Sequence, residues 1–344
     1  MMQHEITEKK RLLNEDGVLT EPGYAKKFLF DYLRSDIKAN SLRIKEWDYY
    51  LINNDKFALA LTIADNSYMG LDSVSFIDFN NKWQHTKSYM SFMTKGIKSL
   101  PSSSLNGDTI SSGKSYTIKF INDVKKRILS AHLDDFMKNI QFDAEIELTD
   151  EPKESMVIAT PYKEDKLAFY YNQKINCMKA EGFVKFNGNI YEFKKNDSFA
   201  VLDWGRGVWT YKNTWYWGSA SGYIDNIPFG FNIGYGFGDT SAASENMIIY
   251  NGKAHKLDRV KFVIPKKDGK DDFLSPWKFI SNDNRFTMSF EPVLDRSSCT
   301  SLGIIKSDQH QVFGRFTGEV VLDDNKIIRV KDLLGFAEKV FNKW

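Results

Sequence analysis

An alternation of apolar and polar residues at every second position is the feature of this sequence that most constrains its fold. The alternation recurs in short runs over most of the 344 residues, and a period of two is that of a β-strand with one buried face. The runs 42–52 and 56–65 are separated by Asn53-Asn54-Asp55, which predicts a hairpin turn. A second hairpin is predicted in residues 182–193, around Asn187-Gly188-Asn189. We therefore expect an all-β protein.

Signals for other kinds of structure are sparse. A short helix is expected at Pro22–Tyr32 and another at Val330–Asn342. Val124–Lys138 has a composition compatible with a helix, but its apolar residues alternate, which favours strands. Ser99–Gly113 is rich in Ser, Gly and Asn and predicts an exposed loop.

So many short strands do not fit one open sheet, because a strongly twisted sheet curls or splits as it widens. We therefore expect two tandem antiparallel β-barrel domains with few short helices. The predicted domains are residues 1–175 and 176–344, with the crossover between them in Asn172–Gly182.

Charge and composition exclude several classes of partner. The chain has 47 basic and 45 acidic residues, a net charge of +2, so no strong field favours nucleic acid or an anionic membrane. Cys177 and Cys299 are too few for a disulfide framework or a zinc site, and buried free thiols in a reducing compartment are expected. The N-terminus is polar, and no apolar stretch approaches the ~20 residues that span a bilayer. We expect a cytoplasmic protein without a membrane span, metal or cofactor.

A block of aromatic residues between positions 204 and 238 is the strongest indication of where a functional site lies. Residues 204–217 contain four tryptophans and two tyrosines, and in Phe229–Gly238 aromatic or apolar residues alternate with Gly or Asn. Rings on one face and almost no side chain on the other indicate a surface that a neighbour approaches closely. That neighbour is either a ligand or the indoles of the block itself. The polar segment Asp239–Asn246 follows and could form a barrel mouth, although an Asx or Ser/Thr turn explains part of it equally well.

Several long sequence motifs resemble those of a known family. They include LDWGRGVWTY, GFNIGYGFGDTSAASENM, FEPVLDR and QHQVFGRFTGEVVLDD. The family is catalogued as domain of unknown function 2804 and is grouped with the lipocalin-like (calycin) barrels. It is distantly similar to two-domain lipocalin-like carotenoid hydratases and to cyclase-like enzymes. The resemblance implies tandem lipocalin-like barrels over nearly the whole chain, and it implies no reaction, because fold does not settle function.

Four titratable residues are candidates for acid–base chemistry: Asp203, Asp239, Glu245 and His310. On a regular strand Asp203 and Arg206 would face opposite sides, but the glycines beside Arg206 could form a bulge that pairs them. The pair would be either an acid tuned in an aromatic pocket or a structural ion pair. His310 suits proton transfer because its ordinary pKa is about 6.5, although a lone histidine is often structural. The candidate ligand-binding residues are Trp204, Arg206, Trp209, Trp215, Trp217, Asn232, Tyr235 and Asn246.

Three functions remain open at this point. The first is binding of a hydrophobic or amphipathic small molecule in an aromatic-lined cavity of the second half. The second, which borrows from the resemblance to hydratases, is a cofactor-independent acid–base enzyme (hydratase, isomerase or cyclase) acting on an isoprenoid or lipid-like substrate. The third is a structural or interaction module without a ligand.

The position of Lys174 is also open. This residue, in the cluster Tyr170–Lys174, either stacks on an aromatic ring or lies at the surface.

Overall fold

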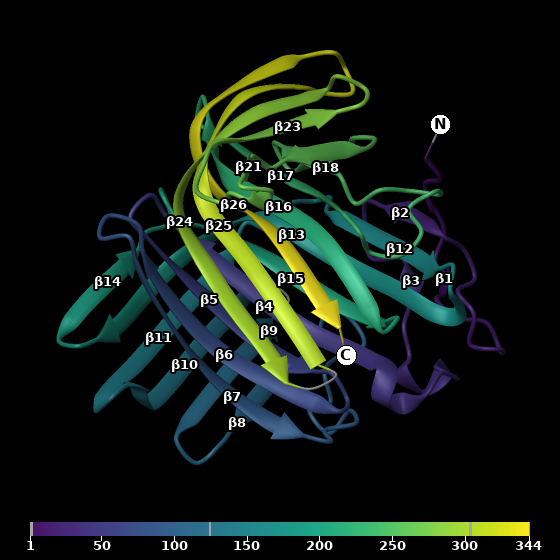
Figure 1. Cartoon of the computed structure of the whole chain (residues 1–344), viewed down its shortest axis with the longest axis horizontal. Helices are drawn as coiled ribbons and strands as arrows, with labels where there is room; N and C mark the ends of the chain where they lie inside the picture. Colours follow the sequence, from purple (N-terminus) through teal and green to yellow (C-terminus); the bar gives the residue numbers. More distant parts are fainter. Residues whose placement is uncertain (1–2, 124, 303–304, 344) are drawn as a thin grey trace.

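The computed structural model describes residues 3–123, 125–302 and 305–343 (Figure 1). They form two curled antiparallel half-barrel sheets, which confirms the predicted all-β class. The first sheet has 13 strands: β2 (Gly23–Ala25), β4 (Ile44–Asn53), β5 (Phe57–Asp65), β6 (Met69–Asp78), β7 (Trp83–Phe92), β8 (Thr109–Ser112), β9 (Tyr116–Asp123), β10 (Lys126–Met137), β11 (Ile140–Thr149), β12 (Met156–Tyr162), β13 (Asp165–Phe186), β14 (Asn189–Phe193) and β15 (Phe199–Val208).

The second sheet has nine strands: β16 (Lys212–Ile224), β17 (Ile227–Tyr235), β18 (Met247–Tyr250), β19 (Lys253–Lys256), β20 (Val260–Val263), β23 (Trp277–Ser281), β24 (Phe286–Leu302), β25 (Ile305–Val321) and β26 (Ile327–Lys343). Four very short strands pair outside the two sheets: β1 (Lys10–Arg11) with β3 (Phe30–Asp31), and β21 (Lys266–Lys267) with β22 (Lys270–Asp271). Helical structure in the described residues consists of two 3-10 turns, η1 (Arg34–Asp36) and η2 (Ser41–Arg43).

Both predicted hairpins are confirmed, since β4 pairs with β5 and β13 with β14. The two predicted helices are wrong. Pro22–Tyr32 contains β2 and β3, and Val330–Asn342 lies inside β26. β26 is hydrogen-bonded to β16 on one side and to β25 on the other, and such pairing overrides local helix propensity.

The segment Val124–Lys138 is largely a strand. Residues 126–137 form β10 as the alternation predicted, while Val124 lies outside the described residues. The predicted crossover segment Asn172–Gly182 lies within the long strand β13. The domain division at residue 175 stays a prediction; the hydrogen-bonded sheets themselves separate between Val208 and Lys212.

Most of the segment Ser99–Gly113 is exposed, as its composition predicted, but buried residues anchor it to the first half-barrel. Leu100, Ser104, Thr109 and Ser111 are buried, and the segment ends in β8. Interior side chains of the first half-barrel satisfy its polar groups. The Arg206 Nη2 group donates to the Pro101 carbonyl at 2.8 Å, for example, and the Thr109 hydroxyl donates to Asp48 at 2.5 Å.

The apolar core has three parts, two inside the curled sheets and one between them. β4 shows how one strand serves two of these parts. Tyr50 and Ile52 belong to the interior of the first half-barrel, whereas Tyr49 and Leu51 belong to the layer between the sheets. This division follows from the period of two, because successive side chains of a strand point to opposite faces.

A β-bulge in β13 joins the first sheet to the second. The register with β15 shifts between Ile175 and Met178, and Cys177 has a φ of 63°. The Asn176 amide donates to the Ser219 hydroxyl at 2.7 Å, and the Cys177 backbone N–H donates to the Ser221 hydroxyl at 3.0 Å. The bulge therefore docks β13 onto β16.

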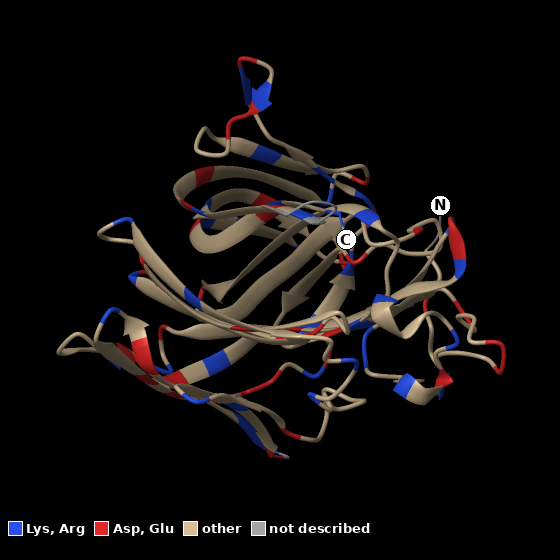
Figure 2. Ribbon diagram, turned by 60° about the horizontal axis from the view of Figure 1, so that its bottom comes forward, with Lys and Arg blue, Asp and Glu red and all other residues tan. Residues whose placement is uncertain are grey.

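Basic and acidic residues are interspersed along the ribbon, in keeping with the balanced net charge (Figure 2). Among the described residues, we find no helix of the length and apolarity that a bilayer crossing requires. The cytoplasmic location stays a prediction.

Candidate functional site

A buried ion pair faces the second sheet from β13 and β15. Lys174 and Asp203 are register partners, and the Lys174 Nζ atom lies 2.9 Å from Asp203 Oδ1. The Asn172 amide donates to the same oxygen at 2.6 Å. Only 1% of the Lys174 side chain is exposed, so this cation depends on its partners for stability in the interior.

The second sheet supplies an aromatic face to the same lysine. Lys174 Nζ lies 3.9 Å from the ring centroid of Trp217, a cation–π contact. The expected stacking of Lys174 is therefore confirmed, and its surface placement is wrong. The Trp217 indole donates to Asn232 at 2.6 Å, and the Asn232 amide donates to the backbone carbonyl of Glu245 at 2.8 Å. Asn232 thus fixes both the indole and the segment that carries Glu245.

Glu245 is a buried carboxylate without a partner for its oxygens. Its residue is 2% exposed, and neither Oε1 nor Oε2 has a hydrogen-bond partner in the described part of the chain. Burial raises the pKa of Glu245 to about 7; the positive charge of Lys174 opposes this rise, and the negative charge of Asp203 adds to it. Glu245 is therefore near enough to both to respond to their charges.

A second carboxylate reaches the same region from β26. Glu338 accepts hydrogen bonds from the Trp215 indole at 3.0 Å and from the Gln311 amide at 3.1 Å. Burial raises the pKa of Glu338 to about 7, and the bond from Trp215 and the charge of Lys174 oppose the rise. We call the set Asn172, Lys174, Asp203, Trp217, Glu245 and Glu338 the polar cluster.

Aromatic rings pack beside the polar cluster. Phe237 lies 5.8 Å from Lys174 Nζ and stacks on Tyr170 at a centroid distance of 4.6 Å. Trp209 packs edge-on against Trp47 at 5.5 Å and against Trp215 at 5.2 Å. We call these five residues the ring cluster. Trp47 and Trp215 are only half-buried, so the ring cluster extends from the polar cluster to the protein surface.

Sequence comparison places the chain in a family. A family model described as a domain of unknown function, DUF2804, matches residues 3–344. The chain belongs to the DUF2804 family. This confirms the resemblance found in the sequence. No curated protein sequence is significantly similar to the DUF2804 protein.

One solved structure of low sequence identity shares the fold, and two others have TM-scores just below 0.5. A Nitrosomonas europaea protein described as a candidate AttH is 9% identical over 90% of this chain and 96% of its own, with a TM-score of 0.52. Kievitone hydratase from Nectria haematococca is 11% identical over 91% and 92% of the two chains, with a TM-score of 0.49. The protein CghA is 8% identical over 98% and 97%, with a TM-score of 0.47. At these identities the likeness concerns the fold alone.

The DUF2804 protein brings some of the predicted site residues together. Asp203, Trp217 and Glu245 belong to the polar cluster, and Asn232 positions two of them. The predicted residues Trp209 and Trp215 belong to the ring cluster. Trp217 lies in the layer between the two sheets and Trp215 packs against that layer, whereas Trp209 belongs to the core of the first half-barrel; the sequence had pointed to a cavity within the second half.

Other predicted residues lie elsewhere. Asp239 pairs with the exposed Lys163 at 3.5 Å. His310 lies on the opposite face of β25 from Gln311; it stacks on Phe273 at 3.8 Å and binds Asp295 at 2.7 Å. The bond to Asp295 raises the pKa of His310.

Two more predicted residues have structural roles in the second half. Tyr235 stacks on Tyr216 at 4.5 Å, beside the second half-barrel core. The side chain of Asn246 accepts from Gly234 N–H at 2.7 Å and donates to the Asp258 carbonyl at 2.7 Å. It therefore braces the segment that carries Glu245.

The expected pairing of Asp203 with Arg206 is wrong. β15 stays in register with β4 throughout, so no bulge turns the two side chains to one side. Arg206 points into the first half-barrel, where Nη1 lies 3.0 Å from Asp48 and the guanidinium carbon lies 4.1 Å from the Trp204 ring centroid. Trp204 accordingly belongs to the core of the first half-barrel.

On the Gly/Asn face of β17, the Trp217 indole approaches Asn232, as one of the two expectations held, and two of the glycines face other neighbours. A Cβ atom at Gly230 would lie 2.6 Å from Cys177 Sγ, and one at Gly234 would lie 2.6 Å from Glu245 Oε1. The glycines therefore make room for the β13 bulge and for the buried carboxylate.

Proposed function

We propose that the DUF2804 protein binds an amphipathic small molecule between its two sheets, at the polar cluster and the ring cluster. The observation that carries the proposal is Glu245, a buried carboxylate with two unpartnered oxygens beside Lys174. Burying such a group costs stability. Titratable groups with strongly shifted pKa values, surrounded by aromatic rings and a few polar groups, are typical of binding sites.

The neighbouring rings add polar groups that a ligand could use. The Tyr170 hydroxyl and the Trp209 indole N–H are buried, and neither has a hydrogen-bond partner among the described residues. A ligand hydroxyl or carbonyl could pair with either group and with Glu245, while its apolar body packs on the rings. Trp47 and Trp215 are the half-buried members of the ring cluster, so rotation of their side chains is the route we propose for ligand access.

The test is native mass spectrometry of the protein purified from its own host, followed by extraction of lipids and small molecules. We expect a stoichiometric co-purifying molecule with an apolar body and at least one hydroxyl or carbonyl group. Trp217→Leu removes the ring under Lys174 and should lower occupancy by about tenfold, the effect of about 1.4 kcal/mol.

The matched control is Trp83→Leu, because Trp83 is half-buried on the first sheet and packs on Phe186 at 6.2 Å. It should leave occupancy unchanged. Equal retention of the molecule by both variants would place it outside the polar cluster. The absence of any bound molecule would favour the interaction module without a ligand.

Acid–base catalysis at the same site is the second candidate, and the pKa of Glu245 favours it. A carboxyl group with a pKa near 7 can donate or accept a proton at neutral pH. Asp239 and His310 have no role in this proposal, because they lie outside the polar cluster.

Deuterium transfer distinguishes the two candidates. The extracted molecule is incubated in D₂O with the protein or with Glu245→Gln, and its mass is followed. Catalysis predicts deuterium incorporation with the protein and about a hundredfold less with the variant, the usual contribution of a general acid. Binding without incorporation in either sample would leave the binding function and exclude proton transfer to carbon.

A further inference from the structure

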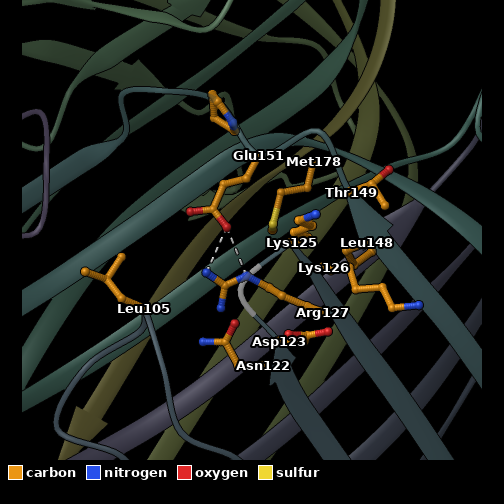
Figure 3. Close-up of a pocket in the computed structure, with 11 residues that line it drawn as sticks. Leu105, Asn122, Asp123, Lys125, Lys126, Arg127, Leu148, Thr149, Glu151 and Met178 are labelled. Atoms are coloured by element: carbon orange, nitrogen blue, oxygen red, sulfur yellow. Dashed lines mark hydrogen bonds and ion pairs between the residues drawn. The ribbon is translucent and has the colours of Figure 1, made fainter.

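The first half-barrel carries a pocket that is separate from the polar cluster. It has a volume of about 240 Å³ and lies where β9 and β10 meet the segment after β11 (Figure 3). Its apolar lining residues are Leu105, Leu148, Pro152 and Met178, of which Leu148 and Met178 are almost fully buried, and Arg127 and Glu151 meet in its centre. A pocket below the roughly 300 Å³ of drug-sized sites suits a small ligand.

Arg127 is held rigidly at this pocket. It is 5% exposed, and its Nη1 group donates to the Ser104 carbonyl at 2.9 Å. Its Nε and Nη2 groups both donate to Glu151 Oε2, at 3.1 and 2.9 Å. A guanidinium group presents such paired donors to any carboxylate.

Glu151, by contrast, is held less firmly. Its side chain is 38% exposed, and it belongs to the connection between β11 and β12 rather than to a strand. It can therefore turn toward water without disturbing the hydrogen bonds of the sheet. The buried guanidinium group would then need another anion, because an unpaired buried charge is costly.

We propose that Arg127 anchors a second ligand site, which takes a small amphipathic carboxylate in exchange for Glu151. The ligand carboxylate would occupy the Arg127 donors, and its alkyl chain would cover Leu105 and Pro152. Leu105 is 53% exposed at the pocket, so covering it adds a hydrophobic gain. This inference does not rest on the function proposed for the polar cluster.

The test uses octanoate as the probe and isothermal titration calorimetry of the full chain, with 1-octanol as the uncharged control. Glu151→Gln removes the competing carboxylate and should tighten octanoate binding by about tenfold, since a neutral amide binds a guanidinium group less strongly than a carboxylate does. Leu105→Asp places a negative charge at the exposed rim and should weaken binding by about tenfold. Any binding of octanol should be the same for the protein, Glu151→Gln and Leu105→Asp, because octanol lacks the carboxylate that Arg127 would bind.

Two control variants locate the site. Leu274→Asp changes a leucine in the second half that is 60% exposed, and it should leave octanoate binding unchanged. Glu245→Gln should also leave it unchanged. Both Glu151→Gln and Leu105→Asp alter exposed side chains and are expected to fold, so the test does not depend on removing the buried Arg127. The inference is overturned if octanoate binds neither the protein nor Glu151→Gln, if all variants bind alike, or if only Glu245→Gln changes the affinity.

Discussion

Replacing Lys174 with methionine is expected to lower the free energy of unfolding by about 3–5 kcal/mol at pH 8. The substitution keeps much of the side-chain volume but leaves Asp203 buried without its cation, beside two further carboxylates. It also removes the ammonium group from the Trp217 face. Urea denaturation followed by tryptophan fluorescence measures the change. The loss should become smaller as the pH falls through 7, because Glu245 and Glu338, whose pKa values are about 7, then take up protons.

Lys163→Met is the matched control for this substitution. Lys163 pairs with Asp239 at 3.5 Å, but 74% of its side chain is exposed. Surface pairs contribute little, so the change should stay within about 0.5 kcal/mol. Similar small effects from both substitutions would mean that the polar cluster is hydrated and does not depend on Lys174.

Glu245→Gln is expected to stabilise the protein at alkaline pH. The pKa of Glu245 in the folded protein is about 7, above the ordinary value of 4.5. Between these two values the folded state binds more protons than the unfolded state, so stability falls as the pH rises through this window. Glutamine mimics the protonated acid at every pH. The variant should match the protein near pH 4.5 and exceed its stability at pH 8 by about 2–3 kcal/mol.

Urea midpoints measured from pH 4.5 to pH 8 check this expectation. Glu192→Gln is the control, because 67% of the Glu192 side chain is exposed and its replacement should shift the midpoints little at any pH. A Glu245→Gln variant that is less stable than the protein at pH 8 would show that the ionised carboxylate is well paired in the folded state.

The architecture was predictable because its signal is local. Alternation along residues 42–65 and the Asn-rich turn between the two runs are properties of neighbouring residues, and they produce β4 and β5. The helix expected at Val330–Asn342 failed for the opposite reason. This segment becomes a strand because β16 and β25 flank it, and nothing within the segment itself specifies those partners.

The site was predictable only in part. The sequence singled out Asp203, Trp217 and Glu245, which lie in or near the aromatic block. It missed Glu338, whose partners Trp215 and Gln311 come from other strands. A signal was nevertheless present. Phe336, Glu338 and Val340 occupy one face of β26, where a carboxylate between two buried apolar residues marks a buried charge.

The glycines of β17 also have neighbours that the sequence alone could not identify. Their spacing indicated a close neighbour, but only the folded chain identifies it as the β13 bulge and the Glu245 carboxylate. Similarly, the buried positions Leu100 and Ser104 of the largely exposed segment Ser99–Gly113 could not be recognised, because the arginines that bind the segment lie on β10 and β15.

The layer between the sheets has a consequence for any attempt to produce one half of the protein alone. The chain passes from β15 to β16 through residues 209–211, a convenient position for truncation. A fragment cut there would expose Leu51 and Val201 to water, and the complementary fragment would expose Phe336. Exposed apolar surface of this kind promotes association. The two halves, although joined by a short connection, are therefore unsuited to separate expression, and shuffling them between relatives would require the residues on both faces of this layer to be exchanged together.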